Sequence, residues 1–395
     1  MDALAGVGWI PAARFQFREE KLSHMTGAMY AAVAGLKTHM GAMNVIGNNI
    51  ANVNTNAYKA SSYTFKESLY TTSRGGSDGT DTQGGVNPAQ IGYGCSIGSI
   101  DMDMSSKNYA PTGRALDICI DGDGFLMVGD KGMGPFTDGL ASNGTTSSAR
   151  SLDLVRLGRL KFDPKGYLTD DQGRCVYGFA TATKGDNADG AAQGTPELQP
   201  NLTELRIPYV RTENKDGVVT KTICYPKVDE SGRVIDNNSS EDADENVTYE
   251  RALLDSIQIS KTGVITGVTK DTDTPVVIGQ IALGQVDNPE GLTHVDGRYF
   301  KALDGAGNLH ITSMGGQITN HRDTEGAGGA ADNANTTEIE HAGGTSTISG
   351  GLESSGTDLA TEISNMIVMQ RGYQANTRII TVTDSMLEEL VNMKR

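Results

Sequence analysis

The two ends of the chain carry apolar residues at helical spacing, whereas the residues between them are patterned as short strands. Steps of three, four and seven residues between apolar positions are typical of one face of a long helix. The N-terminal stripe consists of Met29, Val33, Leu36, Met40, Met43, Ile46 and Ile50. The C-terminal stripe consists of Leu359, Ile363, Met366, Tyr373, Ile380, Leu387 and Val391. We therefore expect a helix over residues 29–53 and another near the C-terminus, the latter capped by Thr357 or Asp358.

The middle of the chain is rich in glycine, with 50 glycines in 395 residues, and only 6% of all residues are aromatic. Val- and Ile-rich runs alternate there with clusters of Gly, Asp, Asn, Ser and Thr, as in all-β proteins. The expected strands cover residues 115–120, 125–128, 174–180, 256–260, 275–286 and 299–302. Tight turns are expected at residues 121–124 (DGDG) and 163–166 (DPKG).

These patterns predict an α+β chain that is mainly β, with nested β domains and long N- and C-terminal helices forming a coiled-coil-like bundle. The expected boundaries are residues 1–24 for an extra N-terminal segment, 25–56 and 357–395 for a terminal helical assembly domain, 57–95 and 345–356 for connecting segments, 96–182 and 252–344 for an inner β domain, and 183–251 for an inserted outer subdomain.

Polar stretches set several of these boundaries. Residues 183–201 and 229–246 flank the apolar part of the insert and are expected to be its flexible edges. Residues 71–85 are nearly all Gly, Ser, Thr and Asp, so we expect a mobile connection between the first helix and the β body. Residues 326–344 form a similar stretch before the last helix.

Residues 1–24 have no helical repeat and contain the only tryptophan, Trp9. Residues 18–21 (REEK) are what a purine-rich ribosome-binding site would encode if it were read in frame, and Met25 follows shortly after. We expect residues 1–24 to come from a mis-called start rather than from the natural protein. The alternative is a genuine extension with a role in export.

The charge and the apolar distribution exclude several classes of function. Asp and Glu outnumber Lys and Arg by 49 to 33, which gives a formal charge of -16 that repels nucleic acid and anionic membranes. No apolar stretch is long enough for a membrane helix, and no conventional signal peptide is visible. The four cysteines, Cys95, Cys119, Cys175 and Cys224, lack zinc spacing, and we interpret them as buried or free thiols.

The terminal stripes predict self-assembly. Two long helices paired only with each other bury too little apolar surface to offset the entropy of ordering them. We expect these ends to be disordered in the monomer and to fold when copies pack together. The alternative is an intramolecular two-helix hairpin that ties the termini of one domain together.

Four motifs, in order along the chain, resemble the signatures of the flagellar hook and basal-body rod protein family. They are GNNIANVNT at 47–55; LDI and IDGDGF at 116–118 and 120–125; IGQIAL and NPEGL at 278–283 and 288–292; and GLESS, NMIVMQRGYQAN and LVNMK at 351–355, 365–376 and 390–394. The motif residues carried over are Asn48, Asn49, Asn52, Asn54, Asp121, Gly122, Gly124, Phe125, Gln370, Arg371 and Asn376. The chain departs from the family pattern at Ala57, where a glycine is usual, and at residues 155–158 (VRLG), where an aromatic residue usually comes first.

The resemblance spans the chain from Met25 onward apart from the polar insert, and length, insert and C-terminal motifs resemble hook members most. It implies a hook subunit that polymerises into a curved tube outside the cell, a universal joint that passes torque from rod to filament. It also implies rod, hook-cap and hook–filament junction proteins and the flagellar export apparatus as partners, and export without a cleaved signal peptide. The close alternative is the distal rod subunit.

No motif indicates catalysis, a cofactor or a metal site. Asp121 and Asp123 resemble a calcium loop weakly, but the later ligands of such a loop are missing, and a β-turn explains them better. The six histidines have no metal-ligand spacing. Paired carboxylates occur in any acidic chain, so the alternative from another class is a secreted β-rich adhesin or glycosidase.

Overall fold

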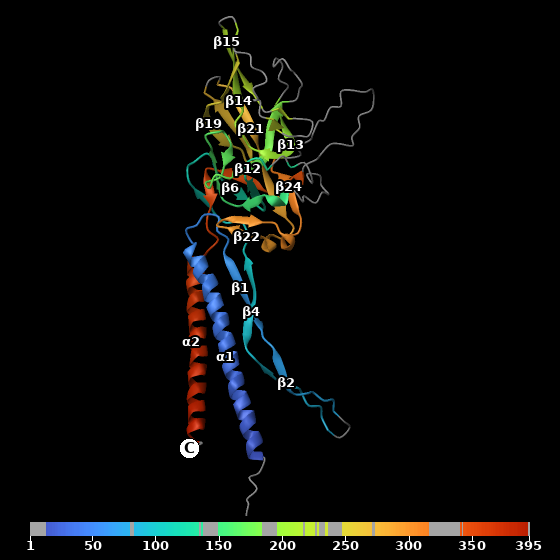
Figure 1. Ribbon diagram of the computed structural model, residues 1–395, viewed down its shortest axis with the longest axis vertical. Coiled ribbons are helices and arrows are strands. Elements are labelled where there is room, and N and C mark those ends of the chain that lie inside the picture. Colours follow the sequence, from blue (N-terminus) through green and yellow to red (C-terminus); the bar gives the residue numbers. More distant parts are fainter. Residues whose placement is uncertain are drawn as a thin grey trace, which may run out of the picture. The chain divides into compact units, whose positions relative to one another are not determined.

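The computed structural model describes residues 13–79, 83–133, 136, 149–183, 196–215, 218–225, 227–228, 234–235, 247–270, 273–315, 340–341 and 343–393. The chain forms two compact units. The helical unit contains the chain up to Val53, Lys59–Asp103 and Thr357–Arg395, and the β unit contains Asn54–Tyr58 and Met104–Gly356. The fold is mainly β with two long terminal helices packed together, which confirms the predicted class (Figure 1).

Helix α1 runs over Ala13–Ala51 and helix α2 over Leu359–Asn392. Helix α1 therefore starts earlier than the sequence predicted, inside the segment in which we saw no helical repeat. Good helix formers such as Arg, Gln, Glu, Lys and Leu fill residues 14–22, so propensity rather than apolar spacing extends the helix there. Residues 1–12 lie outside the described part of the chain.

The start of α2 and the end of α1 are formed by the residues that the sequence indicates. Asp358 is the N-cap of α2, and its Oδ1 accepts a hydrogen bond from the Ala360 amide at 3.1 Å, as predicted. At the end of α1 the Asn52 side chain donates to the Asn48 carbonyl at 2.9 Å. The asparagine-rich motif thus adds a side-chain hydrogen bond to a carbonyl that also accepts the Asn52 amide at 3.2 Å, which reinforces the last turn of the helix.

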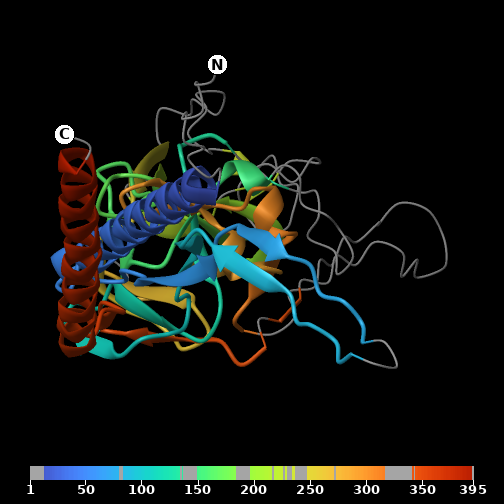
Figure 2. The ribbon, with the colours of Figure 1, turned by 90° about the horizontal axis from the view of Figure 1, so that it is seen from below.

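A long antiparallel ribbon completes the helical unit. Strand β1 (Ser61–Glu67) pairs with β4 (Cys95–Met102), and β2 (Tyr70–Arg74) pairs with β3 (Ala89–Gly92). Ser77 and Val86 form a further antiparallel bridge. The sequence predicted a mobile connection at residues 71–85; the described residues of that segment belong to the paired ribbon, because paired backbone amides and carbonyls stabilise strands whatever their side-chain composition. The β2–β3 part of the ribbon extends away from the helices (Figure 2).

The largest sheet of the β unit has thirteen strands among the described residues. They are β7 (Phe125–Gly129), β8 (Asp153–Val155), β10 (Lys161–Phe162), β11 (Leu168–Thr169), β12 (Cys175–Thr183), β13 (Pro196–Glu204), β19 (Leu254–Ile259), β20 (Val264–Thr269), β21 (Pro275–Val286), β22 (Thr293–Asp296), β23 (Tyr299–Lys301), β24 (Leu309–Ser313) and β25 (Glu340–His341). Its central path runs β10-β11-β12-β21-β7-β8-β23-β22, and β21 also pairs with β20 and β24.

Smaller sheets complete this unit. Their strands are β5 (Tyr109–Pro111), β6 (Asp117–Asp121), β9 (Gly158–Arg159), β14 (Tyr209–Lys215), β15 (Val218–Cys224), β16 (Lys227–Val228), β17 (Val234–Ile235), β18 (Val247–Arg251), β26 (Ser346–Ser349) and β27 (Gly351–Glu353). They pair as β26-β6-β9, β27-β5, β15-β14-β18 and β16-β17. Short 3-10 helices cover Ala149–Ser151, Pro289–Gly291 and Asp304–Ala306.

The six predicted strands are all present, and β21 has the predicted bounds. The structure also shows which elements lie in several of the predicted segments. Residues 345–356, predicted to be a connecting segment, contain β26 and β27, which pair with strands of the β unit before the chain continues into α2. Residues 57–95 contribute most of the ribbon. Residues 196–201, expected to be a flexible edge, belong to β13. The three-stranded sheet β15-β14-β18 lies within the predicted insert. Most of residues 229–246 and 326–344 are outside the described chain.

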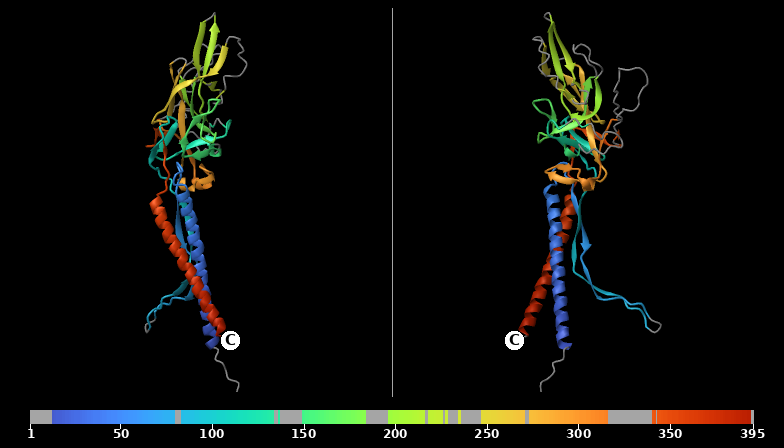
Figure 3. Two further views of the ribbon diagram at one scale, coloured as in Figure 1. Left: turned by 90° about the vertical axis from the view of Figure 1, so that its left-hand side faces the viewer. Right: turned by 45° about the vertical axis from the view of Figure 1, so that its right-hand side comes forward.

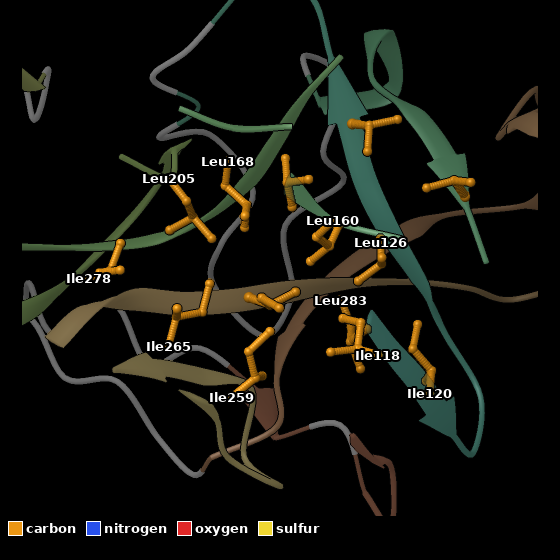
Figure 4. Close-up of a cluster of buried hydrophobic side chains, with 14 of the residues drawn as sticks. Ile118, Ile120, Leu126, Leu160, Leu168, Leu205, Ile259, Ile265, Ile278 and Leu283 are labelled. Atoms are coloured by element: carbon orange, nitrogen blue, oxygen red, sulfur yellow. The ribbon is translucent and has the colours of Figure 1, made fainter. Parts of the chain in front are cut away.

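Aliphatic side chains from the central strands form the core of the β unit (Figure 4). Ile118 of β6, Leu126 of β7 and Leu283 of β21 are fully buried, and Leu205 and Ile278 continue the same cluster. Each such side chain stabilises the fold by about 1.5–3 kcal/mol on burial. The β unit thus has a core of its own that does not depend on the helices.

The predicted turns are confirmed. Residues 121–124 join β6 to β7, with Gly122 at φ 117° and Gly124 at φ 127°, conformations that favour glycine. In the second turn Asp163 Oδ1 accepts the amides of Lys165 and Tyr167 at 2.7 and 2.9 Å. This is an Asx-type turn, which explains the aspartate.

All four cysteines are free thiols, as predicted; Cys95 is half-buried and the others are buried. None of the described helices combines the length and the apolar character that crossing a membrane requires.

Candidate assembly surface of the helical unit

Helix α1 packs one face of small residues against the ribbon. A Cβ atom at Gly94 of the ribbon would lie 3.1 Å from the Ala34 Cβ, and one at Gly41 would clash with the Ile97 side chain of β4. The Thr38 hydroxyl lies 3.0 Å from the carbonyl oxygen of Cys95 in β4 and 2.8 Å from that of Ala34 within the helix. Small side chains let the strand backbone approach the helix closely, so this face is a permanent internal contact.

A second face of α1 contacts α2, and the two helices cross (Figure 3). A Cβ atom at Gly35 would lie 2.7 Å from Asn376 Nδ2, and one at Gly372 would lie 2.7 Å from the His39 ring. His39 Nδ1 also lies 3.3 Å from the Met369 sulfur. Each helix thus has a glycine against which a polar side chain of the other helix packs: Asn376 against Gly35, and His39 against Gly372. The family-motif residue Asn376 therefore has a packing role.

The buried Asn49 side chain joins the three parts of the helical unit. Its Nδ2 donates to the Ser61 carbonyl of β1 and to Glu362 Oε1 of α2, both at 2.8 Å. Its Oδ1 accepts the Ser61 amide at 3.0 Å. Both N–H groups and the carbonyl oxygen of this amide are therefore paired, as burial requires. Asn49 fixes the register of both helices against the ribbon.

Much of α2 is exposed. Thr383 is its only buried residue in the described part of the helix. Of the predicted stripe, Met366, Tyr373, Ile380 and Leu387 are half-buried, which places them on the side toward α1. Leu359, Ile363 and Val391 are exposed.

A further apolar stripe on α2 faces solvent in the single chain. We call it the outward face, and it consists of Val368, Ala375, Ile379, Val382 and Met386. The side chains of Val382 and Met386 are each 52% exposed. Spacings of seven residues from 368 to 382 and from 379 to 386 give it the pattern of a coiled-coil seam. Sequence reasoning missed this second seam because it followed one stripe only, although the spacing was readable.

The predicted stripe of α1 is divided in the structure. Ile46 is fully buried, and Val33 and Met40 are exposed. Met29, Leu36, Met43 and Ile50 are half-buried. Apart from Ile46, the buried side chains of α1 that the structure describes are small or polar, namely Ala32, Thr38, Ala42 and Asn49. A search for apolar residues at helical spacing does not identify such small or polar residues.

The distal ribbon adds exposed apolar side chains. Leu69, Tyr70, Val86 and Ile91 are all exposed, and Leu69 is 81% exposed. An isolated two-stranded ribbon is at best marginally stable in water. The ribbon and the outward face of α2 are therefore two surfaces that further packing would stabilise.

The other motif residues occupy turns and surfaces. Asp121, Gly122 and Gly124 form the β6–β7 turn, and Phe125 is buried at the start of β7. Gln370 and Arg371 are exposed on α2, and Asn54 is exposed after α1. Among the described residues no cluster of three His, Cys, Asp or Glu side chains could hold a metal ion.

Both ends of the chain match family models. Residues 29–59 match the model described as flagella basal body rod protein, and residues 348–393 match the C-terminal model of flagellar basal body rod FlgEFG proteins. The first match covers α1 from Met29 onward and the residues between α1 and the ribbon, and the second covers the end of β26, β27 and α2.

Full-length relatives extend the similarity along the chain. The flagellar basal-body rod protein FlgG of Bacillus subtilis is 30% identical over 94% of this chain and 100% of its own length. The flagellar hook protein FlgE of Borreliella burgdorferi is 25% identical over 94% of this chain and 100% of its own. A solved structure of the Helicobacter pylori hook protein FlgE2 matches 57% of this chain and 43% of its own at 14% identity, with a TM-score of 0.14, which is too low to inform the fold.

The relatives that match this mainly β chain along its length are structural proteins of the flagellar rod and hook, not enzymes. The chain belongs to the flagellar hook and basal-body rod protein family.

Proposed function

We propose that this protein is the structural subunit of the flagellar hook and that it polymerises with copies of itself through its terminal helices. The observation that carries the proposal is the outward face of α2, an apolar seam that is exposed to solvent among the described residues of the helical unit. Burying a Val, Ile or Met side chain contributes about 1.5–3 kcal/mol, so the five residues of this seam supply a substantial driving force for association.

In the polymer, neighbouring copies cover the outward face and the distal ribbon. The Asn49 junction keeps both helices in register with the ribbon, so that each copy presents the same surface. Helical polymers need such head-to-tail contacts between non-identical patches. The helical unit of a free monomer gains stability when these contacts form.

Family membership supports further elements of the proposal. The polymer is a curved tube outside the cell that passes torque from rod to filament, and its outer parts slide past one another as it bends. Rod, cap and junction proteins contact its ends. The subunit travels through the flagellum's own export apparatus without a cleaved signal peptide.

Polymerisation of the purified full chain tests the assembly part of the proposal. Sedimentation and negative-stain microscopy should show tubes for the full chain and monomers for a chain that lacks both terminal helices. Full-length chains that remain monomeric with ordered termini would instead support the intramolecular hairpin.

The second candidate is the distal rod subunit, which the 30% identity to a rod protein favours. The three-stranded sheet β15-β14-β18, within the predicted insert, supports the hook. An antibody against this sheet, applied to isolated hook–basal bodies, distinguishes the two by electron microscopy. Label distal to the outer ring supports the hook, and label within the rings supports the rod.

A further inference from the structure

A buried ion pair lies where the chain enters and leaves the β unit. Arg156 Nε donates to Glu353 Oε2 at 2.9 Å, and the two side chains are 2% and 1% exposed. The Arg156 Nη2 group also donates to the Ser106 hydroxyl at 2.8 Å. Nη2 also donates to the carbonyl oxygens of Gly122 and Ile120 at 2.6 and 3.1 Å, and Nη1 donates to that of Gly124 at 2.5 Å. The guanidinium therefore joins the β6–β7 hairpin to Glu353.

Glu353 lies in the segment that leads into α2. We call residues 351–356 the outgoing connector and residues 54–58, which follow α1, the incoming connector. Both belong to the β unit. Besides Arg156, the Glu353 carboxylate accepts the Lys107 amide at 2.8 Å. Its side chain thus ties the outgoing connector to the interior of the β unit.

The two connectors also bind each other. The Ala57 amide donates to the Glu353 carbonyl, and the Gly356 amide donates to the Tyr58 carbonyl, both at 2.9 Å. The Ser354 amide donates to the Asn108 carbonyl, also at 2.9 Å. A displacement of either connector therefore acts on the Glu353 backbone.

We propose that the Arg156–Glu353 pair is the anchor that holds both connectors in the β unit. A pull on α1 reaches the pair through residues 54–58, and a pull on α2 reaches it through residues 351–356. The pair passes the load to the β6–β7 hairpin, whose carbonyls hold the guanidinium. This role concerns one chain and does not depend on whether the polymer is a hook or a rod.

Variants of the pair can distinguish an anchoring role from the cost of leaving a buried charge unpaired. Removing one partner leaves an unpaired buried charge, which is strongly destabilising by itself. The double variant R156M/E353M removes both charges and keeps apolar volume at both positions. The matched control is R298M, which breaks the Arg298–Asp171 pair of the β unit, where the side chains are 35% and 30% exposed.

Hydrogen exchange of the full chain, read by mass spectrometry, tests the anchor. In R156M/E353M, peptides covering the two connectors should exchange about tenfold faster or more, while peptides from β21 keep their protection. R298M should leave the connectors unchanged. Connector exchange within about twofold of wild type in the double variant would overturn the proposal and leave the pair as a local support of the hairpin.

The wild-type chain provides a test that needs no variant to fold. Under native conditions with increasing denaturant, the connector amides and the amides of residues 120–124 should exchange through one shared opening, with the same dependence on denaturant. Connectors that open at lower denaturant than the hairpin would refute the anchor.

Discussion

Ala57 stores backbone strain where the chain enters the β unit. It adopts φ 58°, a left-handed conformation that costs a residue with a Cβ about 1–2 kcal/mol and costs glycine almost nothing. Family members usually have glycine here, and this chain keeps the left-handed geometry with alanine. The substitution Ala57→Gly should therefore relieve that strain.

The matched control is Ala110→Gly in β5. Ala110 is half-buried like Ala57 and pairs with Leu352 of the same outgoing connector, but its φ is not positive. Both substitutions remove a methyl group and give the unfolded chain the same extra freedom, so these effects cancel in the comparison. The β unit of A57G should be more stable than that of A110G by about 1–2 kcal/mol.

Thermal unfolding followed by calorimetry measures the difference. For a unit of this size each kcal/mol shifts the midpoint by about 2–4 °C, so A57G should melt clearly above A110G. Equal midpoints for the two variants would refute the reasoning that Ala57 is strained.

Three further predictions concern single side chains. Asn49→Ala removes three buried hydrogen bonds, one of them to a carboxylate, and should cost the helical unit about 2–4 kcal/mol in denaturant unfolding, whereas the exposed N48A should cost little. Hydrogen bonds from the Thr361 side chain and the Ala360 amide lower the pKa of Asp358. The ionised Asp358 therefore stabilises α2 fully above the ordinary Asp pKa of about 3.9, and this stabilisation is lost as pH falls through the lowered pKa. At about pH 2 the amides in the first turn of α2 should exchange faster relative to mid-helix amides, and this difference should shrink in D358N. Burial raises the pKa of Cys175 to about 11, so a thiol reagent at about pH 8 should label it far more slowly in the native chain than in urea.

Sequence pattern predicted the parts of the fold that local chemistry decides. Neighbouring residues determine the cap at Asp358 and the glycine turn at residues 121–124, and a continuous apolar run determines strand β21. All three were predicted from the sequence. The part of α1 that precedes residue 25 was missed because propensity, not apolar spacing, forms it.

The local sequence pattern did not show which segments of the chain pack against one another. The ribbon backbone at Gly94 lies against Ala31 and Ala34 of α1, and nothing in the spacing of these alanines indicates the ribbon. The same holds for Arg156, which is buried only because carbonyls distant in sequence converge on it. The ribbon itself has the composition of a linker, and pairing across it decides its structure.

The central claim, that copies assemble through the outward face of α2, is tested most directly by comparing two double variants of that helix. I379N/V382N changes the outward face, and T381N/E388N changes exposed positions outside it. Both should keep the helical circular dichroism of wild type, because the four side chains are exposed in the single chain. In sedimentation assays the wild type and T381N/E388N should form polymers, and I379N/V382N should stay monomeric. Polymers of all three at the same critical concentration would contradict the claim.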